Sequence, residues 1–200
     1  MNWKSVRRFG LVALASLGLA ACGINSVPAA EENAKAKWAD VEAQFQRRAN
    51  LIPNLAEVAK GAAENERAIL TEVTEARAKA TSVNVTANDL GDAAKMEEFA
   101  AAQGQMSAGI GRLLASFEAY PQIPSTQGYI TLQSQLEGTE NRIAVAIRDY
   151  NEAVRQYNTT IRTFPDTIGA NIIHGAEPLV PYAAVTEGAE VAPELDMTSN

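Results

Sequence analysis

The chain has 200 residues, a formal net charge of −7 and a single cysteine, Cys22. One cysteine excludes an internal disulfide and a cysteine-rich metal site, and the acidic balance disfavours electrostatic binding to nucleic acid or anionic lipid. Alanine is abundant, aromatic residues make up only 6%, and alternating β-branched segments are missing, so the composition predicts an all-α fold.

Residues 1–21 have the features of a processing signal. Lys4, Arg7 and Arg8 precede the apolar run FGLVALASLGLAA, which is too short to span a bilayer comfortably. The run ends in LAAC, the pattern of a bacterial lipobox, in which the chain is cut before the cysteine and its sulfur receives a lipid. A plain signal peptide or a short membrane anchor is the alternative. We predict lipidation at Cys22, which would attach the protein to a membrane from outside the cytoplasm.

The proposed cleavage also defines the remaining segments. Removing the three basic residues of the signal takes the formal charge from −7 to −10. Gly23, rather than an aspartate, follows the cysteine, which favours the outer membrane if the cell has two. We expect residues 22–30 to form the lipid anchor and a short linker, 31–185 a single helical bundle, and 186–200 an acidic disordered tail.

A seven-residue apolar repeat runs from residue 31 to residue 80. Two seams spaced three and four residues apart are typical of coiled-coil helices. The repeat continues in the same phase through Pro53, so we predict one helix of about 50 residues that bends at this proline without ending. The first seam contains Trp38, Phe45, Ile52, Ala59, Glu66, Val73 and Ala80, and the second Val41, Arg48, Leu55, Ala62, Ile69 and Ala76.

Two more long helices follow. The segment TSVNVTANDLGD has the composition of a connection, and a second helix is predicted from about residue 89 to 117. YPQIPST then interrupts the chain, and Ser125 or Thr126 is a suitable cap for a third helix ending at Phe164. Residues 165–185 are expected to form a short helix and an extended stretch packed on the bundle. The sequence thus predicts an elongated antiparallel bundle of three long helices plus a short C-terminal helix.

Several motifs resemble the LemA family of membrane-anchored bacterial proteins. They are RRANLIPNL (47–55), TENRIA (139–144) and a repeated YN pair, and the similarity extends over residues 22–170. The resemblance implies an extended helical bundle held at a membrane, without an established enzymatic activity. Many such proteins are anchored by a transmembrane helix, where this chain has a lipobox. Asn50 stands where the family commonly has aspartate, which argues against a role that needs a carboxylate there.

The residues that commonly carry catalysis do not form a recognisable set. His174 is the single histidine, and a lone histidine is more often a surface or packing residue than a ligand. No glycine-rich phosphate loop or Gly-x-Ser-x-Gly elbow is present, and the adjacent pairs Glu31–Glu32 and Glu97–Glu98 fit solvated helix faces. We therefore predict no catalytic residue, no metal, no cofactor and no small-molecule substrate.

The YN pairs recur seven residues apart on one helix face. They are Tyr150–Asn151 and Tyr157–Asn158. The tyrosines are expected to pack in the core with their hydroxyls at its rim, and a recognition surface is the alternative.

Arg48 occupies a seam position that an apolar residue would normally take. If the first hairpin turns near residue 84, Arg48 lies near Tyr120 and Asn50 near Glu118. We therefore predict that Arg48, or its neighbour Arg47, pairs with Glu118.

Two further charged seam residues suggest a polar layer inside the bundle. A second turn near residue 122 would bring Gln103 next to Asn141. The layer predicted from this register contains Glu66, Gln103, Glu140 and Arg142. Buried polar groups can fix helix register, and a ligand site is the alternative.

Trp38, Val41 and Phe45 form an apolar stripe near the start of the first helix. The same register leaves this stripe beyond the lower turn and exposed, which would make it a surface for self-association or for an envelope protein partner. Alternatively, the segment after Pro165 folds back and covers it.

Pro53 leaves one helical carbonyl, that of Ala49, without its usual donor. Asn50 and Asn54 lie four residues apart on one face, and we expect their amides to bridge to that carbonyl.

Taken together, these features predict a lipid-anchored, extracytoplasmic binding or scaffold protein that is not an enzyme. The alternative is an accessory or regulatory subunit of a membrane protease or a cell-envelope hydrolase.

Overall fold

The computed structural model describes residues 22–58, 64–117 and 127–184. Within these ranges the chain forms helices and no strand, so the predicted all-α class is confirmed. The helices are α2 (Cys22–Val58), α3 (Glu64–Ser82), α4 (Ala93–Phe117), α5 (Gln127–Thr160), α6 (Asp166–Gly169) and the π-helical turn η2 (Ala170–His174). None of the helices in this part of the chain is long and apolar enough to cross a membrane.

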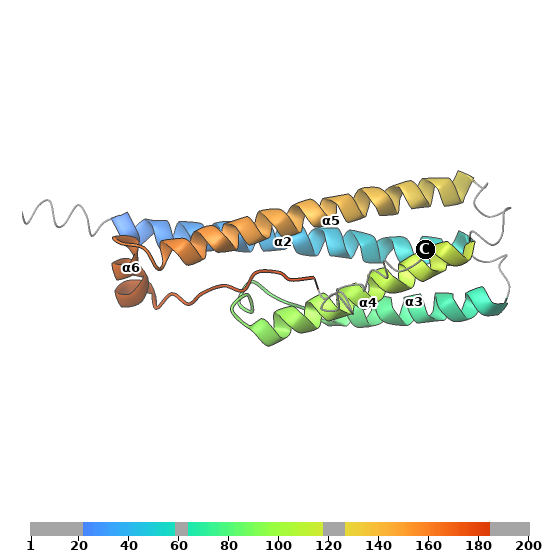
Figure 1. Cartoon of the computed structure of the whole chain (residues 1–200), viewed down its shortest axis with the longest axis horizontal. Helices are drawn as coiled ribbons and strands as arrows, with labels where there is room; N and C mark the ends of the chain where they lie inside the picture. Colours follow the sequence, from blue (N-terminus) through green and yellow to red (C-terminus); the bar gives the residue numbers. More distant parts are fainter. Residues whose placement is uncertain (1–21, 59–63, 118–126, 185–200) are drawn as a thin grey trace, which may run out of the picture.

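The helices form an elongated antiparallel bundle. Figure 1 shows α2 and α5 side by side along its length, while α3 and α4 pack beside them over the half where α2 ends and α5 begins. At the opposite end, α6 and η2 lie against the start of α2, and the extended chain that follows η2 runs back along the bundle (Figure 1). The short C-terminal helix and the extended stretch predicted after Pro165 are both present.

The prediction of one continuous helix from residue 31 to residue 80 is wrong. The Trp38 indole Nε1 donates to the Val85 carbonyl at 2.8 Å, and Arg77 Nε donates to the Ala49 carbonyl at 2.8 Å. Residues 49 and 77 would lie about 42 Å apart in one helix. The chain therefore reverses direction between Val58 and Glu64, and α3 runs antiparallel to α2.

The heptad repeat led to the wrong prediction of a single helix because two antiparallel helices can bury the same seam in one core. Ile52 on α2 and Val73 and Ala80 on α3 are all at most 2% exposed and belong to one apolar cluster. Pro53 lies inside α2, which continues to Val58, so the prediction that this proline does not end the helix is confirmed. Residues 22–30, expected to act as a linker, form the first turns of α2.

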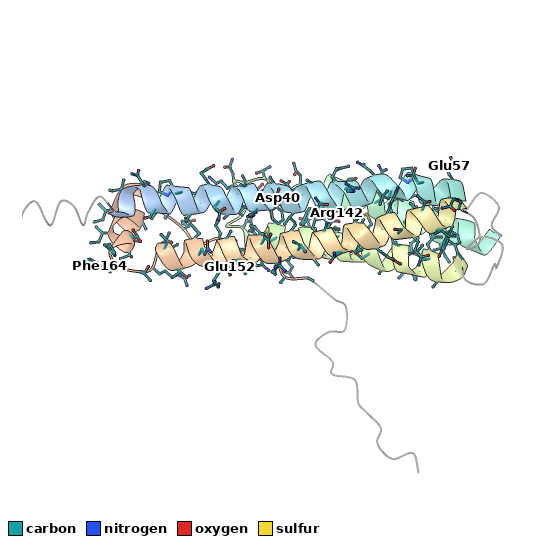
Figure 2. All side chains as sticks on the ribbon, turned by 90° about the horizontal axis from the view of Figure 1, so that it is seen from above. Asp40, Glu57, Arg142, Glu152 and Phe164 are labelled. Carbon is teal, nitrogen blue, oxygen red and sulfur yellow. The ribbon has the colours of Figure 1, made fainter. Side chains whose placement is uncertain are left out.

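Three apolar clusters follow one another along the bundle, while charged side chains such as Asp40 and Glu152 lie on its outside (Figure 2). The cluster at the end shared by all four long helices includes Ile52, Leu55, Val73, Met106, Leu113, Phe117, Leu132 and Leu136. The central cluster includes Trp38, Val41, Phe45, Phe99, Tyr150 and Tyr182. The cluster at the start of α2 consists of Val27, Tyr157, Ile161 and Ala170.

Candidate functional site

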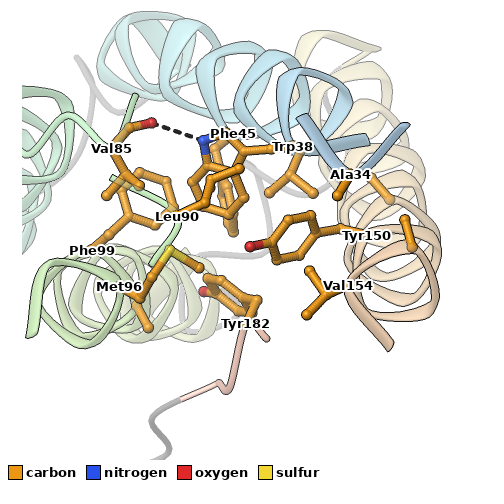
Figure 3. Close-up of a cluster of buried hydrophobic side chains, with 14 of the residues drawn as sticks. Ala34, Trp38, Phe45, Val85, Leu90, Met96, Phe99, Tyr150, Val154 and Tyr182 are labelled. Carbon is orange, nitrogen blue, oxygen red and sulfur yellow. Dashed lines mark hydrogen bonds between the residues drawn. The ribbon is translucent and has the colours of Figure 1, made fainter. Parts of the chain in front are cut away.

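The stripe predicted as an exposed partner surface is buried. Trp38, Val41 and Phe45 are 1%, 0% and 4% exposed. The Trp38 ring packs edge-on against Tyr150, with ring centroids 5.1 Å apart, and against Phe99 at 5.4 Å (Figure 3). The partner-surface prediction is wrong because α4 and the extended C-terminal segment cover the stripe, which is the alternative we had left open.

We call residues 177–182 the strap. Two asparagines of α5 hold it by its backbone. Asn158 donates through Nδ2 to the Leu179 carbonyl at 2.8 Å, and its Oδ1 accepts from the Leu179 N–H at 2.9 Å. Asn151 makes the same pair of bonds with Tyr182, at 3.0 and 2.8 Å. Each side-chain amide thus acts as the neighbouring strand of a sheet would.

The tyrosines of the YN pairs complete this arrangement. The Tyr150 hydroxyl donates to the Val180 carbonyl at 2.8 Å, and the Tyr157 hydroxyl donates to the Glu177 carbonyl at 3.0 Å. The Val180 N–H donates to the Leu90 carbonyl in the α3–α4 connection at 2.8 Å. The strap residues at positions 178 and 181 are prolines, which have no N–H to satisfy. Every N–H donor of the strap between 178 and 182 is therefore paired.

Burial raises the pKa of two tyrosine side chains at the strap. Burial raises the pKa of Tyr182 to about 12, with the Arg48 charge opposing the shift and the Glu140 charge adding to it. Burial also raises the pKa of Tyr150. Both phenols are therefore neutral at physiological pH and act in packing or as hydrogen-bond donors.

A polar layer lies next to the aromatic cluster and is organised by Arg48. This side chain is 1% exposed although it carries a permanent charge. Its Nη2 donates to the side-chain Oε1 of Gln103 at 2.8 Å and to the Gln103 backbone carbonyl at 3.2 Å. Its Nη1 donates to Ser107 Oγ and to Glu140 Oε1, the latter at 3.2 Å. The guanidinium also lies over the Phe45 ring, 5.0 Å from its centroid.

The structure corrects the predicted membership of this layer. Gln103 and Glu140 are in it, but their cation is Arg48 on α2, because α2 and α4 run parallel. Arg48 therefore does not lie at the lower turn as predicted. Arg142 is exposed and donates to Thr139 Oγ1 at 3.3 Å.

The remaining predicted site residues fall outside the layer or outside the described side chains. Arg47, Asn50, Pro53, Asn54 and Asn141 are exposed. The side chains of Glu66 and Glu118 lie outside the part that the structure describes, so the predicted contact of Arg47 with Glu118 stays a prediction.

The carbonyl that Pro53 leaves without a donor is that of Ala49, as predicted, but its partner is different. Arg77 on α3 supplies the hydrogen bond through Nε. Asn50 instead accepts from Gln46 Nε2 at 2.9 Å. The acceptor that the motif leaves on α2 is therefore satisfied by a residue of another helix.

A surface depression borders the polar layer. Glu42, Gln46 and Gln103 contribute polar groups to its lining, together with Phe45, Ala49, Ala80, Thr81 and Asn84. Burial raises the pKa of the Glu42 carboxyl. Among the described residues, no group of three His, Cys, Asp or Glu side chains is placed to hold a metal ion, and His174 is exposed.

Sequence reasoning missed Arg77, Ser107 and the backbone of the strap as partners. Arg77 and Ser107 lie off the seams we assigned, and their roles depend on the reversal of the chain after Val58. The YN repeat did indicate one face of α5, but its partner is main chain, which has no residue-specific pattern.

The fold and this layer define an elongated α-helical bundle closed by its own C-terminal segment. A family model described as the LemA family matches residues 37–196, and the chain belongs to that family.

The chain is also similar to three magnetosome proteins. Magnetosome proteins MamQ 1 and MamQ 2 of Paramagnetospirillum magneticum are each 28% identical to it over 145 residues, covering 64% of this chain and 53% of the relative. Magnetosome protein MamQ of Magnetospirillum gryphiswaldense is 26% identical over 136 residues, covering 60% and 50%. The chain spans about half the length of these curated relatives.

Proposed function

We propose that this LemA-family protein is a non-enzymatic scaffold at the cell envelope, anchored to a membrane through a lipid on Cys22. The observation that carries the proposal is the LAAC lipobox that ends at Cys22, in a chain whose residues directly after this cysteine already belong to helix α2. Family membership and the magnetosome relatives support membrane association. An extracytoplasmic location follows from the proposed processing.

A bundle that starts at its anchor acts as a spacer. The 37 residues of α2 correspond to a length of about 55 Å. Residues near the end of α2, such as Arg47, Asn50 and Asn54, are exposed, and they would stand tens of ångströms from the membrane. We propose that this face of α2 contacts the protein partner, because the Trp38 stripe is buried inside the bundle.

The polar groups inside the bundle support binding rather than catalysis. Arg48, Gln103 and Glu140 are engaged with one another, and the tyrosines of α5 donate to the strap. These contacts fix the arrangement of α2, α4, α5 and the strap. A fixed arrangement of this kind is what a scaffold requires.

Photocrosslinking in intact cells tests the partner proposal. A photoreactive residue at Asn50 should yield an adduct with an envelope protein, identified by mass spectrometry, and the same residue at the exposed Arg148 of α5 should not. An adducted protease or hydrolase would favour the accessory-subunit alternative. Equal adducts at both positions, or none at either, would contradict a partner face on α2.

The anchor is tested on the same protein without crosslinking. If Cys22 carries a lipid through its sulfur, the chain purified from membranes takes up no maleimide label after denaturation, since Cys22 is its single cysteine. The Cys22→Ala variant should lose metabolic labelling by an alkyne fatty acid. A fully reactive thiol in membrane-extracted protein would refute lipidation.

A further inference from the structure

Large exposed apolar side chains gather at one end of the bundle. Six large hydrophobic residues of the described chain are exposed, and four of them lie between residues 164 and 173. These four, which we call the apolar tip, are Phe164 (72% exposed), Ile168 (47%), Ile172 (78%) and Ile173 (57%). Exposed apolar residues that are grouped in one place commonly mark a binding surface, whereas scattered ones do not.

The apolar tip is held in place by buried contacts on its other side. Ala170 is 0% exposed and packs with Val27, Tyr157 and Ile161. Ser26 Oγ on α2 donates to Asp166 Oδ1 on α6 at 2.7 Å. Gly169 of α6 and Ala170 of η2 face inward, so these two elements direct their isoleucines outward. Their exposure is a consequence of the fold.

The tip lies at the end of the molecule where α2 begins. Figure 1 shows α6 beside the first turns of α2, and Figure 2 labels Phe164 at that end. Ser26, which contacts α6, is four residues after Cys22, a rise of about 6 Å along a helix. The apolar run of residues 9–21 ends directly before Cys22. A lipid on Cys22 or an uncut apolar segment would each bring a membrane to this end.

The charges around the tip favour lipid over a charged partner. Between residues 163 and 173 the sequence contains one ionisable side chain, Asp166, and it already accepts a hydrogen bond from Ser26. Transfer of the tip into a membrane interface would therefore leave no unpaired carboxylate on its outer face. Arg162 is the single Lys or Arg between residues 160 and 180, so attraction to anionic lipid contributes little.

From these observations we propose that the apolar tip inserts into the interface of the lipid bilayer beside the anchor. The proposal rests on the membrane anchoring put forward above. The lipid provides attachment, and the tip provides a second contact several ångströms away, which fixes the orientation of the bundle relative to the membrane. Two weak membrane contacts on one molecule also hold it more firmly than either contact alone.

Depth-dependent fluorescence on the full-length protein tests this proposal. The protein is purified from membranes, reconstituted into phosphatidylcholine vesicles and recovered by flotation. An environment-sensitive dye is attached at Ile168→Cys or, as a matched control, at Ile130→Cys near the start of α5. These isoleucines are 47% and 49% exposed, and Ile130 belongs to the opposite end of the bundle. We expect quenching by spin-labelled lipid to be at least about threefold stronger at position 168.

A second variant separates insertion from mere proximity. Replacing the exposed Ile172 and Ile173 by serine should lower the lipid partitioning of the tip by about tenfold or more and reduce quenching at position 168 to the control level, with an unchanged helical circular dichroism spectrum.

The outcomes distinguish the two proposals. If the protein floats with the vesicles but positions 168 and 130 are quenched equally, the tip proposal is overturned while the anchor stands. If the protein does not float, both are overturned. Quenching at 168 that requires anionic lipid would replace apolar insertion with charge attraction and so overturn the tip proposal.

Discussion

Arg77 Nε on α3 donates a 2.8 Å hydrogen bond to the carbonyl of Ala49 on α2, the acceptor that Pro53 leaves without a helical donor. Proline lacks the N–H that would close this turn, and Ala49 is only 2% exposed, so solvent has little access to the carbonyl. A residue that weakens α2 locally thus creates the acceptor that ties α2 to α3.

We predict that Arg77→Ala destabilises the protein by about 1–3 kcal/mol, because it leaves a buried carbonyl unsatisfied. In a Pro53→Ala background the residue-53 N–H returns to Ala49, and the cost of Arg77→Ala should fall by about 1 kcal/mol. Urea unfolding followed by circular dichroism gives the free energy of unfolding of the native protein, the two single variants and the double variant. Strictly additive effects would show that Pro53 and Arg77 do not share the acceptor.

The Arg48–Glu140 pair should respond unequally to loss of its two partners. The Arg48 side chain is 2% exposed and that of Glu140 is 49% exposed. Glu140→Ala leaves the buried Arg48 charge without its counter-charge and should cost about 3–5 kcal/mol, while Arg48→Met leaves only a half-exposed carboxylate and should cost about 1–2 kcal/mol. Methionine is chosen at position 48 because it retains volume without charge. Equal losses at positions 48 and 140 in urea titrations would contradict this asymmetry.

Asn158 is predicted to hold the strap through its side-chain amide. Asn158→Leu keeps a side chain of similar size but removes both bonds to Leu179, so amide hydrogen exchange at Leu179 should accelerate about tenfold or more, corresponding to about 1.4 kcal/mol. The exposed Asn171 of η2, which bonds Thr167 of α6 four residues earlier, provides Asn171→Leu as the control. Unchanged protection of Leu179 in Asn158→Leu would mean that apolar packing alone retains the strap.

The buried phenol of Tyr182 predicts alkaline destabilisation. Its pKa is about 12 in the folded protein, against an ordinary value of 10.0. The stabilisation is complete below pH 10 and is lost as the pH rises towards 12, since the unfolded chain releases this proton first. Urea midpoints measured between pH 8 and 12 should fall more steeply for the native protein than for Tyr182→Phe. The pKa of Tyr150 is also raised by burial, so the urea midpoint of Tyr182→Phe should still fall with pH, but less steeply. Identical pH slopes for the two proteins would show that Tyr182 does not contribute to the alkaline loss of stability.

Several parts of the fold could be predicted because they depend on local chemistry. Helix propensity and heptad spacing identified the helical class, most of α4 and α5, and the continuation of α2 through Pro53. The proline after Phe164 placed the end of α5 four residues too late, since α5 ends at Thr160. The register that brings Gln103 level with Glu140 was also close, because it follows from a single turn between adjacent helices.

The remaining features depend on which helices meet. A heptad repeat identifies the buried face of a helix but not the point where the chain reverses between two heptads. The sequence by itself therefore determined that Trp38, Phe45 and Arg48 lie on the seam face of one helix. Tertiary structure alone decided that Arg48 meets Gln103 and Glu140, and that Tyr182 of the strap packs on Phe45. These contacts join residues tens of positions apart, and the free energy of packing, which no local pattern encodes, selects among the possible pairings.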